Sequence, residues 1–216
     1  MSAIPKINDD CRILSDLAAS LFDAETRVGV ARINDCDPRT LFESEVRGIR
    51  NAVASRAREF AAGRTAARQA LGQSVAIDTA LDRTPLWPNG VAGSITHAAG
   101  FAVAAVSRRA KMVGLDLEPH EDLPEEIIET VLSPSERTRV GDLREARLVF
   151  SLKECAYKAQ FPLTRQIFGF DGFEVAWSSG KFEAEFRQPV GDFDKGHVLA
   201  GRYGIDGGFI LSGISA

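Results

Sequence analysis

The sequence predicts an α+β protein, with helices mostly early in the chain and antiparallel strands concentrated toward its end. Long stretches rich in Ala, Arg and Glu without proline favour helices. From residue 173 to 214, apolar and polar residues alternate between glycine-containing turns, which is typical of an antiparallel sheet. Each half also offers a helix followed by a strand meander. This permits an approximate internal duplication, which the sequence does not prove.

Composition bounds the possible functions. The chain has 216 residues, enough for one large domain or two small ones, and a formal net charge of −4. This charge argues against wholesale binding to nucleic acid or to an anionic membrane. Any anion-binding site must therefore be a local cluster of Arg and Lys.

Cysteines and apolar runs indicate the compartment. The three cysteines show no metal-type spacing, and their odd number argues against a disulfide framework. The N-terminus lacks the apolar run of a signal peptide, and no window is apolar for long enough to cross a bilayer. We therefore expect a cytoplasmic protein.

The first half is expected to open with a helix capped by Asp9 and Asp10, followed by a strand over residues 27–33. Residues 41–71 are helix-forming throughout. A turn-rich segment at 83–90 precedes two short strands, at 93–97 and 101–107.

The long helix carries arginines of two kinds. Arg64 falls on its apolar stripe, where a buried guanidinium needs a partner, and Arg56 borders the same face. Anion binding is the favoured interpretation for both. For Arg58 and Arg68 a solvated face paired to Glu59 is preferred. The stripe itself consists of Val53, Ala57, Phe60, Ala67 and Leu71.

The turn after residue 97 offers a second place for an anion. Ser94, Thr96 and His97 put hydroxyls and an imidazole beside small residues, where backbone N–H groups can meet a phosphate. A lone turn histidine is nevertheless more often structural than functional.

The polar break at 107–111 is the expected boundary between the halves. Beyond it we expect a short helix over 123–132 and a capping box in which Ser133 is the N-cap and Glu136 the third helical residue. A longer helix should run from after Gly141 to about Gln160 and stop at Pro162.

The strand Val113–Glu118 carries two carboxylates on one face. Alternation places Val113, Leu115 and Leu117 on one side and Asp116 and Glu118 on the other, with the Cα atoms of the two acids roughly 6–7 Å apart. Oxygen ligands in this arrangement suit Mg²⁺. The alternative is a solvent-facing edge strand, and on these residues alone the two interpretations are about even.

The helix after Gly141 carries a second charged group. Glu154 and Lys158 form an i,i+4 pair beside Lys153, which alone would be an ordinary surface ion pair. Its occurrence with the strand carboxylates and the histidine turn changes that interpretation.

Taken together, these motifs resemble a known family. Val113-Gly-Leu-Asp-Leu-Glu118 and Phe150-Ser-Leu-Lys-Glu-Cys-Ala-Tyr-Lys158 are similar to the two signature motifs of the 4′-phosphopantetheinyl transferases. The segments 58–68 and 87–101 resemble the enterobactin-synthetase component D group. The resemblance spans roughly Arg56 to Lys158, with small departures at Ala98, Phe101 and Cys155.

The resemblance implies two similar α/β halves related by a pseudo-twofold axis, residues 1–110 and 111–216, with coenzyme A (CoA) bound between them. It implies transfer of 4′-phosphopantetheine from CoA to a serine of an apo acyl or peptidyl carrier protein, releasing adenosine 3′,5′-bisphosphate. It also suggests a monomer. The carrier and pathway, whether siderophore, polyketide, peptide or fatty acid, stay open.

The resemblance also implies roles for individual residues. Asp116, Glu118 and Glu154 would hold Mg²⁺, or Mn²⁺, together with the CoA pyrophosphate. Glu154 would take the serine proton, directly or through a metal-bound water, and Lys158 would stabilise or protonate the departing phosphate. The remaining CoA phosphates would be bound by Lys153, His97, Thr96, Arg56, Arg64 and, as a weaker candidate, Arg83.

Two other functions remain at this point. One is a non-catalytic binder of CoA or nucleotide phosphates that kept the cleft, and the other is a structural or interaction domain with solvated charges. The retained carboxylates and lysines favour the enzyme. Because CoA, a typical carrier protein and this chain are all acidic, local basic patches must steer binding, and affinity should depend on salt.

Overall fold

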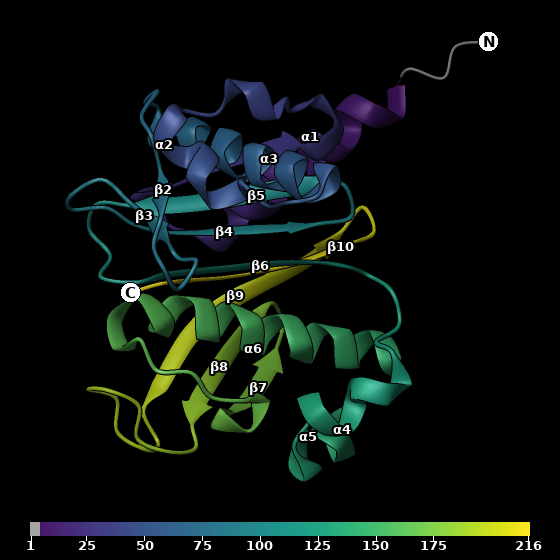
Figure 1. Ribbon diagram of the computed structural model, residues 1–216. Helices are drawn as coiled ribbons and strands as arrows, with labels where there is room; N and C mark the ends of the chain where they lie inside the picture. Colours follow the sequence, from purple (N-terminus) through teal and green to yellow (C-terminus); the bar gives the residue numbers. More distant parts are fainter. Residues whose placement is uncertain (1–4) are drawn as a thin grey trace.

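The computed structural model describes residues 5–216 and has two α/β layers stacked on each other (Figure 1). Its strands are β1 (Thr26–Arg32), β2 (Asp78–Thr79), β3 (Pro85–Leu86), β4 (Ala92–Ala98), β5 (Phe101–Ser107), β6 (Val113–Pro119), β7 (Phe173–Ser178), β8 (Lys181–Phe186), β9 (Val198–Asp206) and β10 (Phe209–Ser215). Its helices are α1 (Pro5–Leu21), α2 (Glu43–Val46), α3 (Ala54–Leu71), α4 (Ile128–Val131), α5 (Pro134–Arg139) and α6 (Leu143–Thr164). The predicted mixed fold with antiparallel sheets is confirmed.

Two antiparallel sheets meet at the seam between the halves. The first has the order β1-β5-β4 and the second β6-β10-β9-β8-β7, while β2 and β3 form a separate small hairpin. Strands β4 and β6 lie side by side where the sheets meet (Figure 1). Helix α3 covers the first sheet and α6 the second, so each half is a sheet with one long helix.

Three apolar clusters hold this arrangement. One packs α3 against β1 and β5, one packs α6 against the second sheet, and the third joins the halves through α1, β5, β6 and β10. In the joining cluster, Val113, Leu115 and Leu117 are buried beside Leu14, as the alternation of β6 predicts. The interpretation of β6 as a solvated edge strand is therefore wrong.

Three expected boundaries differ in the structure. Helix α1 begins at Pro5, so Asp9 and Asp10 lie within it instead of capping it. The stretch 41–71 is broken into α2, a 3-10 turn and α3, and the Glu45 carboxylate of α2 accepts the N–H of the distant Ile77. Pro162 lies inside α6, which continues to Thr164 because a proline in the last turn removes only one helical N–H bond.

None of the helices described by the structure combines the length and apolar character that a bilayer crossing needs.

Candidate active site

Asp116 occupies the centre of the seam. It lies on β6 opposite Ser212 of β10, and its side chain is buried. One carboxylate oxygen, Oδ1, accepts a bond from Lys158 Nζ at 2.5 Å, and the other, Oδ2, is buried without a hydrogen-bond partner. A buried carboxylate oxygen left open is costly, so it marks a place where a cation or donor group would be bound favourably.

Glu118 lies two residues further along the same face of β6. Its Oε2 atom accepts a bond from Arg147 Nη1 at 3.0 Å, a partner on α6 that sequence reasoning missed. Burial and the neighbouring charge of Asp116 raise the pKa of Glu118 to about 7, against the lowering effect of Arg147. Like charges at this spacing favour the arrival of a further cation.

Lys158 projects from α6 to Asp116 of β6, whereas Glu154, one turn earlier in α6, lines an aromatic cavity. Burial raises the pKa of Glu154, opposed by Lys158 and reinforced by Asp116. Burial alone would lower the pKa of Lys158, but the carboxylates of Asp116 and Glu154 outweigh it and raise that pKa. Lys158 is thus an ammonium group that is ion-paired to Asp116 and also feels the charge of Glu154.

These acids were predicted to share one divalent cation. Within residues 5–216, no three His, Cys, Asp or Glu side chains converge as a ready-made metal site. The open Oδ2 of Asp116 and the all-oxygen donor set still suit a hard cation such as Mg²⁺. The three-carboxylate site therefore stays a prediction.

Thr96 connects the two halves. Its hydroxyl oxygen accepts the Leu117 N–H at 3.1 Å and lies 3.4 Å from both Asp116 Oδ1 and Lys158 Nζ. The side chain is buried, so its observed contacts are with β6 and α6. It is placed to orient Asp116, and a phosphate contact for Thr96 has no support among these contacts.

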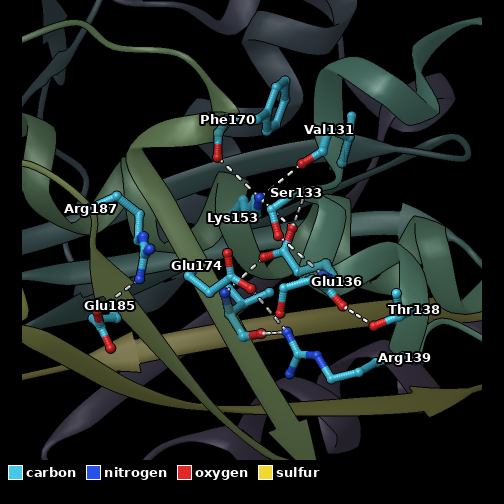
Figure 2. Close-up of polar contacts among 12 residues, drawn as sticks. Val131, Ser133, Glu136, Thr138, Arg139, Lys153, Phe170, Glu174, Glu185 and Arg187 are labelled. Carbon is cyan, nitrogen blue, oxygen red and sulfur yellow. Dashed lines mark hydrogen bonds and ion pairs between the residues drawn. The ribbon is translucent and has the colours of Figure 1, made fainter.

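The contacts of Lys153 differ from its predicted role as a ligand of a CoA phosphate. Its ammonium group is ion-paired to Glu136 at 2.7 Å and donates to the carbonyls of Val131 and Phe170 at 2.8 and 3.0 Å (Figure 2). An ammonium group has three N–H donors, and here all three are used. With its side chain only 1 % exposed, Lys153 cannot bind a CoA phosphate in this conformation.

A cationic cavity of about 480 Å³ lies in the first half beside β4. Arg56, Arg64, Arg83 and His97, all predicted as CoA ligands, line it together. Sequence reasoning missed two further arginines of the same cavity. They are Arg47 and Arg50, which lie shortly before α3. The sequence marks them only by their separation of three residues.

Arg64 is the most buried cation of this cavity. Its Nη2 donates to Thr79 Oγ1 at 2.8 Å, its guanidinium lies 4.1 Å from the centre of the Phe60 ring, and its Nε atom has no hydrogen-bond partner. Burial lowers the pKa of Arg64 to about 10, so the group stays charged at neutral pH. A buried, incompletely paired guanidinium favours an anionic ligand.

His97 forms the side of the cavity nearest the acids. Arg56 Nη1 lies 2.6 Å from His97 Nε2 and 3.0 Å from Glu59 Oε2. Because Arg can only donate, Nε2 accepts and the imidazole proton resides on Nδ1. Burial, followed by the charge of Arg56, lowers the pKa of His97. Since Thr96 is its neighbour in the chain, the cavity and the acid pair are adjacent along β4.

The predicted pairing of Arg68 is wrong. Arg68 was expected on a solvated face with Glu59, but its Nη1 lies 2.8 Å from Oε1 of the fully buried Glu45. The partner comes from α2, which the predicted continuous helix did not separate from α3.

Comparison with known proteins decides the family. Residues 43–107 match the 4′-phosphopantetheinyl transferase N-terminal domain, and residues 112–203 match the 4′-phosphopantetheinyl transferase superfamily. The chain is 36 % identical to the 4′-phosphopantetheinyl transferase Npt of Nocardia iowensis over 189 residues, covering 77 % of this chain and 85 % of Npt. The chain belongs to the 4′-phosphopantetheinyl transferase superfamily.

Further relatives agree. The transferase Svp of Streptomyces mobaraensis is 38 % identical over 177 residues, with 75 % of this chain and 70 % of Svp covered. Enterobactin synthase component D of Escherichia coli K12 is 33 % identical over 136 residues, with 58 % of this chain and 65 % of that protein covered. This phosphopantetheinyl transferase is therefore an enzyme of the type that the motifs in β6 and α6 indicated.

A second, smaller cavity of this transferase adjoins Glu154. It has a volume of about 140 Å³, and its wall is largely aromatic. The side chains of Tyr157, Phe168, Phe170 and Phe173 line it together with Glu154. Tyr157 and Phe168 meet edge to face, with ring centres 5.5 Å apart. An apolar wall next to a carboxylate excludes water from one side of that acid.

Proposed function

We propose that this transferase moves the 4′-phosphopantetheine group of CoA onto a serine hydroxyl of an apo acyl or peptidyl carrier protein. The observation that supports the proposal is the ion pair of the buried Asp116, whose Oδ2 atom has no hydrogen-bond partner, with Lys158, next to an arginine-lined cavity. CoA carries both a diphosphate and a 3′-phosphate, which require cations at two separate places.

The cationic cavity would bind CoA through charge. The phosphates of CoA would be contacted by Arg56, Arg64, Arg83 and His97, joined by Arg47 and Arg50 from the same cavity. Guanidinium groups suit phosphate oxygens because their paired N–H donors can bind two oxygens at once. The buried position of Arg64 makes it the strongest of these contacts.

Asp116, Glu118 and Glu154 would hold a divalent cation, Mg²⁺ or Mn²⁺. When bound, such a cation neutralises charge on the diphosphate as the P–O bond breaks. Lys158 would turn from Asp116 toward the departing phosphate and neutralise or protonate it. Arg147 would retain Glu118 in place through its present ion pair.

Glu154 would act as the base. The serine oxygen forms a bond to the β-phosphorus of CoA, the bond from that phosphorus to the adenosine bisphosphate breaks, and the serine proton passes to Glu154. Burial already raises the pKa of Glu154, which makes its carboxylate a better proton acceptor near neutral pH. The products are the holo carrier protein and adenosine 3′,5′-bisphosphate.

The test is incubation with CoA, Mg²⁺ and a panel of purified apo carrier proteins, read by intact mass. One phosphopantetheine group should be added to at least one carrier, and Asp116→Ala should abolish the addition while the protein stays folded. Arg64→Ala should raise KM for CoA, whereas Arg58→Ala, an exposed arginine on the same helix, should not. Unchanged turnover of Asp116→Ala would reject the proposed mechanism.

A further inference from the structure

A buried glutamate ties together three elements of the second half (Figure 2). Glu136 is the third residue of α5, and its Oε2 atom accepts the N–H of Ser133 and the ammonium of Lys153, both at 2.7 Å. Its Oε1 atom accepts the Val175 N–H from β7 at 2.8 Å. One carboxylate therefore joins the short helix α5, the long helix α6 and the strand that follows α6.

The first half contains the same arrangement. Glu45 is the third residue of α2, and its Oε2 atom accepts the N–H of Phe42 at 2.9 Å. Its Oε1 atom accepts the Ile77 N–H and a bond from Arg68 Nη1, each at 2.8 Å. Here too, one carboxylate joins a short helix, the long helix and the chain entering the next strand.

We name the pair Glu45–Arg68 the N-clamp and the pair Glu136–Lys153 the C-clamp. Both glutamate side chains are 0 % exposed. A buried ion pair is costly to desolvate and can often be replaced by apolar residues without loss of stability. Two such pairs at matching places therefore call for an explanation other than stability.

The C-clamp leads to the catalytic wall. Lys153 precedes Glu154 in α6 and holds the Phe170 carbonyl at 3.0 Å, while Phe170 lines the cavity beside Glu154. Val175, held by Glu136, follows Phe173 by two residues on β7, and Phe173 lines the same cavity. The hydrogen bonds of Lys153 and of Glu136 thus both fix backbone next to the cavity beside Glu154.

The N-clamp leads instead to the cationic cavity. Helix α2 runs directly into the turn that carries Arg47, and Gly48 of that turn packs so closely that a Cβ atom would lie 3.2 Å from the Phe60 ring. Ile77, held by Glu45, precedes by two residues Thr79, the hydrogen-bond partner of Arg64. The N-clamp is therefore connected to two arginines of the cavity, to Arg47 through α2 and to Arg64 through Thr79.

We infer that Glu45 and Glu136 are positioning residues with divided tasks: the N-clamp sets the wall that binds CoA, and the C-clamp sets the wall that carries Glu154. The inference rests on the proposed function, because the division is defined by CoA binding and by turnover. A purely structural pair of clamps would make no such division.

The test compares two matched double variants of the full chain, Glu45→Gln/Arg68→Met and Glu136→Gln/Lys153→Met. Each removes both charges of one clamp, so no unpaired charge is left buried. Cooperative thermal unfolding establishes that both are folded. If either fails to fold, the charge-conserving single variants Arg68→Lys and Lys153→Arg replace the pair, because each keeps an opposite charge beside the buried glutamate.

Calorimetry measures the Kd for CoA, and intact-mass kinetics with an acceptor carrier protein measure kcat. Loss of the N-clamp should raise Kd for CoA by about tenfold and leave kcat within about threefold, because it disturbs binding alone. Loss of the C-clamp should lower kcat by about tenfold to a hundredfold and leave Kd within about threefold, because small misplacements of catalytic groups have large effects.

The inference is overturned if both variants change the same quantity, or if neither changes any. Failure of the proposed function has a different signature, since the unaltered chain would then modify no carrier protein. In that case the CoA titrations still decide, because the inference requires weaker binding by the N-clamp variant alone. Equal weakening, or none, refutes it.

Discussion

The two halves of this transferase share one frame but carry different side chains at its centre. Phe101 follows the β4–β5 turn and pairs with Arg32, and Phe209 follows the β9–β10 turn and pairs with Pro119. The rings of Phe101 and Phe209 meet edge to face, with centres 5.6 Å apart. Positions on β1 and β6 can therefore be matched by counting back from these pairs.

Three residues before Arg32 lies Gly29, and three before Pro119 lies Asp116. The matching partner of Glu118 is, by the same count, Ala31. The clamps also align α3 with α6, because Arg68 and Lys153 hold the same place in each. Gln69, which follows Arg68, therefore matches Glu154, which follows Lys153. All three acids proposed to bind the cation thus have uncharged counterparts in the first half.

Helix packing explains how the second half makes room for an acid. A Cβ atom on Gly29 would lie 2.2 Å from the Ala66 carbonyl, so α3 rests directly on β1 at the position that matches Asp116. In the second half the equivalent close approach lies two residues earlier, where a Cβ on Gly114 would lie 2.3 Å from the Cys155 carbonyl. Shifting the contact leaves the Asp116 position able to carry a side chain.

The largest effect is expected at Glu154, which is compared with its counterpart Gln69 by giving each position the other's residue type. Glu154→Gln should lower kcat by about 10²–10⁴-fold, because it removes the proposed base and a cation ligand. Gln69→Glu, the reverse change at an exposed residue whose Oε1 atom accepts the Val30 N–H, should leave kcat unchanged. Intact-mass kinetics measure both, and equal effects would contradict the asymmetry of the halves.

The close approach of each helix to its strand provides the next comparison. Gly29→Ala and Gly114→Ala should each lower the free energy of unfolding by about 1–3 kcal/mol or more, because the added methyl group meets backbone that cannot move aside. Urea unfolding measures the loss. Gly141→Ala, where a Cβ would meet only the flexible Glu145 side chain at 3.4 Å, is the control and should change little. A tolerated alanine at Gly114 would refute the account of how α6 packs.

The smallest effect concerns the short helices of the clamps. Ser133 Oγ accepts the Glu136 N–H at 3.1 Å, whereas Phe42, at the matching position, has no side-chain acceptor. Ser133→Ala should therefore lower the free energy of unfolding by about 1 kcal/mol. The same urea titration measures this loss. A stability unchanged by Ser133→Ala would show that the serine hydroxyl contributes nothing as a cap.

Local patterns were enough to predict much of the second half. The alternation along β6 placed Asp116 and Glu118 on one face, and the Ser133–Glu136 capping box is present as predicted. Leu148, Leu152, Cys155 and Ala159 recur at spacings of three and four residues in the sequence, and all four are buried in α6. These features depend on residues close together in the chain, whose periodicity a sequence displays directly.

Long-range pairing was not predictable in the same way. Lys153 in a family-like motif resembles a phosphate ligand, but its partner Glu136 and the carbonyls of Val131 and Phe170 come from other elements. Arg68 was misassigned for the same reason, because its partner Glu45 lies 23 residues earlier in the chain. Charge and spacing alone do not distinguish a buried clamp from an open binding site.

The most direct test of the account is a calorimetric titration of Mg²⁺ in the presence of CoA, comparing the unaltered chain with Asp116→Asn. The control is Asp192→Asn, an exposed position in the connection between β8 and β9. If the acids of β6 and α6 act on one cation, Asp116→Asn should weaken Mg²⁺ binding by about tenfold or more, and the control should not. Equal Mg²⁺ affinity in all three proteins would contradict the account.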